Sequence, residues 1–124
     1  MTELLAMADG VRIAWREMGP VAGDARPLLL LHGFVSDAKT NWITYGAAAQ
    51  LVAAGYHCIM PDLRGHGESD RPHDAAAYPP DILADDQLAL VAHLGLTDYD
   101  LAGYSLGART SARMLAKGAA PARV

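Results

Sequence analysis

Cysteine is almost absent from this chain of 124 residues: Cys58 is the only one. A single thiol excludes an internal disulfide framework and a zinc site built on several cysteines, and it is typical of a reducing compartment. The strongest apolar run, residues 28–31, is far shorter than the roughly 20 residues of a membrane-spanning helix. Glu3 lies where a signal peptide would carry positive charge. We therefore expect a cytoplasmic protein that does not associate with a membrane.

Positive charge is also scarce, with 10 Lys and Arg against 14 Asp and Glu and a net charge of −4. This balance provides no basic field for a phosphate backbone and argues against nucleic-acid binding. Hydrophobic residues make up 52% and charged residues 19%. Such a composition is typical of a packed core, and the length fits one domain or part of one.

Turn residues and apolar runs predict the strands. Residues 3–8 and 11–18 flank Asp9-Gly10, a strong turn signal, and are predicted to form an antiparallel hairpin at one edge of a sheet. Residues 28–31 and 56–60 lack alternation, which indicates strands covered on both faces, and residues 99–103 form a third short strand.

Helical spacing of apolar residues predicts the segments between these strands. Helices are expected over 41–54, 82–94 and 106–117, and the glycine- and proline-rich segment 64–80 is expected to be a surface loop. The stripe of the first helix is Trp42, Tyr45, Ala49 and Val52. The alternation of strands and helices predicts an α/β fold with a mostly parallel sheet, an N-terminal hairpin and flanking helices.

The sharpest motif is Gly103-Tyr104-Ser105-Leu106-Gly107, a GxSxG pattern between a predicted strand and a predicted helix. In that context the serine occupies a tight, strained turn at the N-terminus of the helix, and the two glycines leave room for the strand and helix to approach. Free N–H groups there favour developing negative charge. Ser105 is therefore the candidate nucleophile, and the alternative is a chance pattern in a glycine-rich chain.

A second motif, His32-Gly33-Phe34, directly follows the first buried strand. Gly33 allows a sharp turn, and the N–H groups of Phe34 and Leu106 are predicted to form an oxyanion hole with two donors. We interpret His32 as a structural residue that fixes the loop through hydrogen bonds rather than as a catalytic one.

Two other site types receive little support. Residues 61–70 lack the third glycine of a GxGxxG fingerprint, and no phosphate-loop motif is present, which argues against a nucleotide-binding domain. The polar side chains of the following segment match no trusted metal-ligand spacing, so no metal and no cofactor are expected. These side chains are His66, Asp70, His73 and Asp74.

Three segments together resemble the α/β-hydrolase superfamily, particularly its esterase-like and carbon–carbon-bond-hydrolase-like branches. They are LLLLHGF (28–34), PDLRGHGESDRP (61–72) and GYSLGA (103–108). The resemblance implies that residues 1–124 are the N-terminal portion of one such domain, ending at the start of the sixth strand. It also implies that Ser105 is the nucleophile, that Phe34 and Leu106 supply the oxyanion hole, and that residues 64–69 form a structural turn.

The resemblance makes serine-based acyl hydrolysis of a small carbonyl compound the leading function. A serine at the turn makes the haloalkane-dehalogenase and epoxide-hydrolase branches less favoured, because those use an aspartate there. Acyltransfer and haloperoxidase-like chemistry remain alternatives, as does a noncatalytic binding or scaffold protein that keeps the turn only as architecture.

The catalytic acid and histidine of this family follow the nucleophile in the chain. Residues 106–124 contain no Asp, Glu or His, and all five histidines precede Ser105. We therefore expect a completing C-terminal half or second chain to supply them. Self-association through the open edge of the strand over 99–103 is the other expected partnership.

Overall fold

An antiparallel hairpin forms one edge of the sheet, as the Asp9-Gly10 turn predicts. In the computed structural model, which describes residues 2–21 and 23–124, β1 (Thr2–Ala6) pairs with β2 (Arg12–Met18). Gly10 has φ +85°, a left-handed conformation that glycine adopts without a steric cost. Beyond the hairpin, β2 continues the sheet by pairing antiparallel with β4.

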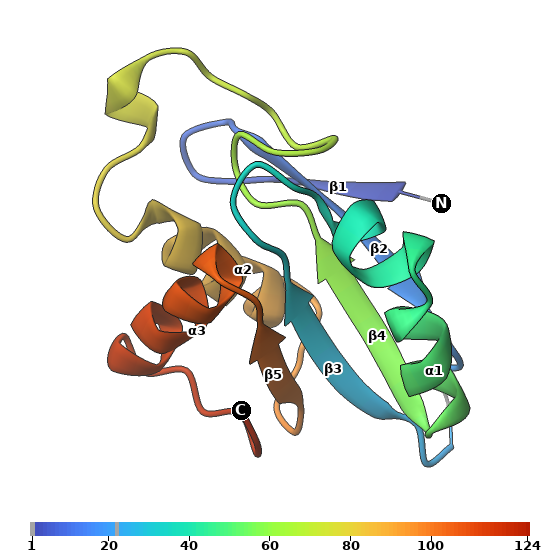
Figure 1. Cartoon of the computed structure of the whole chain (residues 1–124). Coiled ribbons are helices and arrows are strands. Elements are labelled where there is room, and N and C mark those ends of the chain that lie inside the picture. Colours follow the sequence, from blue (N-terminus) through green and yellow to red (C-terminus); the bar gives the residue numbers. More distant parts are fainter. Residues whose placement is uncertain (1, 22) are drawn as a thin grey trace.

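The remaining strands are parallel and direct their carboxyl ends to one edge of the fold. They are β3 (Arg26–Leu31), β4 (Tyr56–Pro61) and β5 (Asp100–Gly103), and the order of the sheet is β1-β2-β4-β3-β5. Because β3 and β5 are paired neighbours, the segment after Leu31 lies beside the segment after Gly103 (Figure 1). The α/β class is confirmed, in a mixed sheet.

Helices cover both faces of this sheet (Figure 1). Alternate leucines of β3 enter two separate cores: Leu29 and Leu31 lie in one, and Leu28 and Leu30 in the other. The second core includes Cys58, whose thiol pKa is raised by burial. The prediction that residues 28–31 are covered on both faces is therefore confirmed.

The helix expected over 41–54 is wrong as a single element. A π-helix, η1 (Lys39–Thr44), precedes α1 (Ala47–Ala53), and Gly46 between them has φ +87°. The break changes the helical phase, so the side chain of Tyr45 is 82% exposed and Ala48 is buried in place of Ala49. Glycine allows this break because the left-handed conformation costs it little.

The other two predicted helices are present. α2 (Ile82–His93) packs Ala84 and Leu90 into the core that holds Leu29, and α3 (Leu106–Ala116) begins directly after Ser105. Gly118 follows α3 with φ +104°. Within the part of the chain that the structure describes, no helix is both long enough and apolar enough to cross a membrane.

The start of the segment predicted as a surface loop is instead buried. Arg64 is 1% exposed, and its guanidinium bonds Asp86 of α2, Asp9 of the hairpin turn and the carbonyl oxygen of Ala77. Ala77 belongs to η2 (Ala75–Ala77), a short 3₁₀ turn. A buried charge requires such partners, so one arginine joins three segments that are distant in the sequence.

Residues after α3 return toward the sheet. A single parallel bridge joins Asp100 to Arg123, and the Leu101 N–H donates to the Arg123 carbonyl oxygen over 2.9 Å. The interpretation of residues 121–124 as the start of a further strand stays a prediction.

Candidate active site

Ser105 occupies a strained turn between β5 and α3. Its φ of +55° and ψ of −112° lie outside the regions that residues with a Cβ normally adopt. The residue is exposed, and its hydroxyl makes no capping bond to α3. The strained backbone that the GxSxG motif predicts is therefore present, and a hydroxyl is held free at the start of a helix.

The two glycines of the motif permit this turn by close packing of backbone. A Cβ built on Gly107 would lie 2.0 Å from the carbonyl oxygen of Leu31, and one built on Gly103 would lie 2.3 Å from the carbonyl carbon of Gly107. Backbone atoms cannot move aside as a flexible side chain can. Side chains at either position would separate α3 from β3 and β5, which agrees with the role predicted for the glycines.

We expect Ser105→Gly to stabilise the fold. The positive φ of Ser105 costs on the order of 1–3 kcal/mol, whereas glycine adopts it freely but adds about 0.5–1 kcal/mol of entropy cost on folding. Because no capping bond is lost, the free energy of unfolding should rise by about 1 kcal/mol. Urea denaturation of the purified protein measures the change.

Ser111→Gly is the matched control, because Ser111 lies inside α3 and its hydroxyl donates to the Gly107 carbonyl oxygen over 2.8 Å. Glycine there should lower the stability by about 1 kcal/mol. Equal destabilisation by both substitutions would show that the turn at Ser105 is not strained.

The loop after β3 lies beside this turn. The N–H of Tyr104 donates to the Leu31 carbonyl oxygen over 3.0 Å, and the Tyr104 ring lies against Gly33, where a Cβ would be 3.0 Å from it. The Gly33 N–H donates to Oδ1 of Asn41 over 2.8 Å. Contacts from Tyr104, which follows β5, and from Asn41 of η1 thus hold the loop that carries Phe34.

His32 fixes the same loop from the buried side. Its Nδ1 lies 2.8 Å from the Gly33 carbonyl oxygen, and its Nε2 accepts the Leu63 N–H over 2.9 Å, so the ring is neutral with the proton on Nδ1. Burial, the largest cause, lowers the pKa of His32 and favours this neutral form. These bonds agree with the structural interpretation of His32, since both ring nitrogens are engaged.

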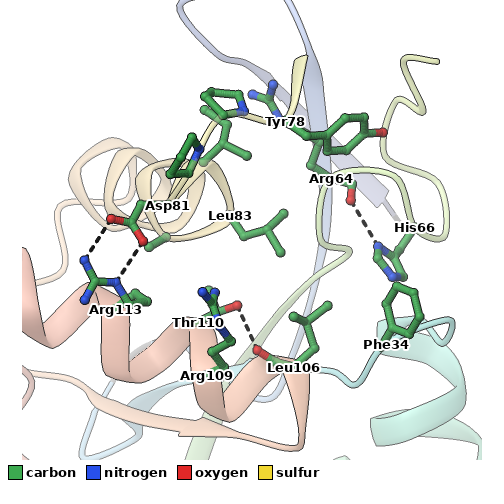
Figure 2. Close-up of a pocket in the computed structure, with 14 residues that line it drawn as sticks. Phe34, Arg64, His66, Tyr78, Asp81, Leu83, Leu106, Arg109, Thr110 and Arg113 are labelled. Atoms are coloured by element: carbon green, nitrogen blue, oxygen red, sulfur yellow. Dashed lines mark hydrogen bonds and ion pairs between the residues drawn. The ribbon is translucent and has the colours of Figure 1, made fainter. Parts of the chain in front are cut away.

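The two predicted oxyanion-hole residues border the same cavity. Phe34 and Leu106 both line a space of about 350 Å³ that opens between α3, the N-terminus of α2 and the loop after β4 (Figure 2). Among the described residues, no backbone carbonyl accepts the N–H of Phe34 or the N–H of Leu106. Both N–H groups are therefore free of backbone acceptors, and Leu106 directly follows Ser105 in the chain.

The charged side chains of this cavity and His66 were not assigned to the active site from the sequence. Arg113 of α3 bonds Asp81 through Nε and Nη2, both at 2.8 Å, and these bonds hold the pKa of Asp81 below its usual value. His66 packs edge-on against the Phe34 ring, with centroids 5.8 Å apart. Because Asp81 and Arg113 are 32 residues apart, helical spacing alone does not show that they meet.

Three of the four side chains considered as metal ligands make hydrogen bonds or ion pairs within the protein. Asp70 bonds the Arg12 guanidinium, Asp74 accepts the Ala76 N–H, and Nδ1 of His66 lies 3.0 Å from the Arg64 carbonyl oxygen. Across residues 2–21 and 23–124, no group of three or more His, Cys, Asp or Glu is placed to hold a metal ion.

Comparison with known proteins identifies relatives of this fold. The family described as "alpha/beta hydrolase fold" matches residues 26–124. The AB hydrolase superfamily protein YisY of Bacillus subtilis (strain 168) is 36% identical over 95 residues, which cover 77% of this chain and 34% of that protein. A fluoroacetate dehalogenase of Burkholderia sp. is 38% identical over 97 residues, covering 76% and 31%.

Solved structures agree with this relationship. The esterase EaEST from Exiguobacterium antarcticum has a TM-score of 0.82 and 28% identity, over 99% of this chain and 42% of that chain. Further relatives are named as a lipase, an epoxide hydrolase and a non-heme haloperoxidase. The chain spans about a third of the length of YisY and of the dehalogenase, at 34% and 31%. Sequence and fold together show that this chain belongs to the α/β-hydrolase fold family.

Proposed function

We propose that this chain carries the nucleophile and the oxyanion hole of a serine hydrolase that acts on carboxylic esters. The observation that carries the proposal is the strained turn that holds the exposed Ser105 hydroxyl at the start of α3, beside the cavity lined by Phe34 and Leu106. Strain of this kind persists where a function requires it. The substrate class is a small carbonyl compound that enters from the cavity.

In the proposed mechanism, Oγ of Ser105 attacks the ester carbonyl carbon and a general base takes its proton. The N–H groups of Phe34 and Leu106 donate to the oxyanion, each contributing about 3–4 kcal/mol to the barrier reduction. The alcohol leaves with a proton, and water then hydrolyses the acyl-enzyme. The strained turn and the free N–H groups support these roles.

The base and its orienting acid belong, in this proposal, to a completing C-terminal half or to a second chain. His32 is engaged at both ring nitrogens, and His57 is held by the Glu17 carboxylate and the Gly19 carbonyl oxygen. Neither histidine is available to serve Ser105. No cofactor is required by acyl chemistry at a serine.

The serine at the turn favours ester hydrolysis over the dehalogenase and epoxide-hydrolase activities that two relatives are named for. The dehalogenase and the epoxide hydrolase are similar to this chain at 38% and 35% identity. This chain nevertheless presents a hydroxyl at Ser105, which is suited to acyl transfer. The structural similarity to the esterase EaEST, which covers 99% of this chain, also supports ester hydrolysis.

A fluorophosphonate probe tests the nucleophile directly. The natural polypeptide that carries this chain should be labelled on Ser105, which tandem mass spectrometry of the tryptic peptide will locate. Ser36→Ala is a matched control, because Ser36 lies in the loop after β3, two residues from Phe34, and should leave the labelling unchanged. Heat-denatured protein should not react.

The noncatalytic scaffold makes the opposite prediction. A folded polypeptide that remains unlabelled, and that hydrolyses neither 4-nitrophenyl butanoate nor hexanoate, would rule out the proposed function. Labelling without hydrolysis but with transfer to an added amine or thiol would favour an acyltransferase. One relative is named as a dihydrolipoyllysine-residue acetyltransferase component and is 37% identical over 119 residues.

A further inference from the structure

Most charged side chains that line the cavity next to the turn at Ser105 are arginines. Of its lining residues, three are arginines and one is an acid, Asp81. Arg113 takes both oxygens of Asp81, and Arg64 is paired with Asp86 and Asp9. Among the described residues, no carboxylate lies within ion-pair distance of Arg109, although its charge contributes to the lowered pKa of Asp81. Arg109 is thus the cation of this cavity without a bonded counter-ion.

Arg109 lies one turn along α3 from the proposed nucleophile. Its N–H donates to the Ser105 carbonyl oxygen over 3.0 Å, the ordinary bond between residues four apart in a helix. Four residues advance about 6 Å along the helix axis. Figure 2 shows Arg109 on the α3 side of the cavity, near Leu106 and Thr110.

The rest of the cavity is suited to an aliphatic chain. Ile82 and Leu83 of α2 line it together with Phe34 and Leu106. An aliphatic chain bound in this cavity would contact these apolar side chains, and the same cavity is lined by Arg109. Arginine binds carboxylates with two parallel hydrogen bonds, which makes it more selective than a point charge.

We propose that the cavity selects esters whose acyl chain ends in a carboxylate, and that Arg109 binds this carboxylate. The inference rests on the proposed function and names its substrate class: monoesters of aliphatic dicarboxylic acids. A chain of four methylenes, as in adipate, is comparable in length to one helical turn, about 5.4 Å.

The kinetic test compares two esters that differ only at the far end of the chain. Mono-4-nitrophenyl adipate carries a carboxylate where 4-nitrophenyl hexanoate carries a methyl group. With the natural polypeptide that contains this chain, kcat/KM for the adipate should exceed that for the hexanoate about tenfold at low ionic strength. Arg109→Gln should bring the ratio of the two kcat/KM values to about one.

Two further variants separate charge from structure. Arg109→Lys should retain part of the preference, because the positive charge remains. Arg71→Gln changes the net charge equally, but Arg71 is exposed, bonds the Gly67 carbonyl oxygen and does not line the cavity, so this variant should leave the preference intact. Raising the salt concentration to 1 M should reduce the preference in wild type and have little effect in Arg109→Gln.

A binding measurement tests the inference without catalysis. Monomethyl adipate should bind the Ser105→Ala variant about tenfold more tightly than methyl hexanoate, by isothermal titration, and Arg109→Gln should abolish the difference. Equal binding of the two esters, or an adipate preference that survives Arg109→Gln, would overturn the inference and leave the proposed function standing. Failure of the proposed function appears separately, as a wild-type protein that binds adipate through Arg109 but is not labelled at Ser105.

Discussion

Ser105→Ala is expected to lower kcat/KM for 4-nitrophenyl esters by about 10³ to 10⁶ in the polypeptide that carries this chain. Loss of the nucleophile in a serine hydrolase leaves only the acceleration that the oxyanion hole and substrate binding provide. Alanine keeps a Cβ at the φ of +55°, so the strain of the turn should remain nearly unchanged. Stopped-flow or steady-state hydrolysis, with active-site titration of wild type, measures the loss.

The stability of this variant provides the control. Its urea midpoint should lie close to that of wild type, since the Ser105 hydroxyl makes no capping bond to α3. A folded Ser105→Ala protein that retained more than a tenth of the activity would assign the nucleophile to another residue. Together with Ser105→Gly, which should be more stable but equally inactive, the pair separates the role of the hydroxyl from that of the backbone.

Local patterns predicted those parts of the fold that depend on neighbours in the sequence. The Asp9-Gly10 turn and the apolar run over 28–31 each specify their element through backbone preference or burial alone. The turn at Ser105 is similar, because its two flanking glycines are required by backbone contacts within one strand–helix unit. These elements were predictable because few alternative conformations fit them.

The helix expected over 41–54 was wrong for a related reason. Apolar residues recur across Gly46 at roughly helical spacing, but the left-handed glycine starts a new helix with a new phase. Periodicity reports which residues are apolar and does not report whether the backbone continues. The exposure of Tyr45 and the burial of Ala48 result from this change of helical phase.

Side-chain contacts between distant segments could not be predicted from the sequence. The bond from Asn41 to the Gly33 N–H, the pair of Asp81 with Arg113 and the position of Arg109 on the cavity depend on how α2, α3 and the loops meet. The predicted site residues come from one edge of the sheet, whereas the charged wall of the cavity comes from tertiary packing. The sequence shows that a residue is charged, but it does not show which residue it pairs with or which way its side chain points.

The second large expected effect is a loss of stability when the buried ion pair of Arg64 and Asp86 is broken. Nε and Nη2 of Arg64 bond the carboxylate of Asp86 over 2.9 and 2.8 Å, and the side chains of the two residues are 0% and 2% exposed. Burial raises the pKa of Asp86 despite this arginine, because removal from water disfavours the charged carboxylate. The pair therefore contributes little net stability compared with apolar side chains, but each partner depends on the other.

Asp86→Ala should accordingly lower the free energy of unfolding by about 3–5 kcal/mol, because it leaves a buried guanidinium with less compensation. Asp85→Ala is the neighbouring control: Asp85 pairs with Lys117 at 2.9 Å with both side chains more than a third exposed, and such surface pairs contribute about 0–1 kcal/mol. Urea denaturation followed by circular dichroism measures both.

The double variant Arg64→Met with Asp86→Leu distinguishes two free energies: the destabilisation caused by an unpaired buried charge, and the net contribution of the intact ion pair. It should recover at least half of the stability lost in Asp86→Ala, since it removes both buried charges and fills their volume with apolar atoms. The remaining partners of Arg64 can return to water, because Asp9 is 43% exposed at its side chain and Ala77 lies in an exposed turn. A loss below 1 kcal/mol for Asp86→Ala would mean that Arg64 is held by Asp9 and Ala77 alone, and that the link between the hairpin turn and α2 is not needed to position the cavity wall.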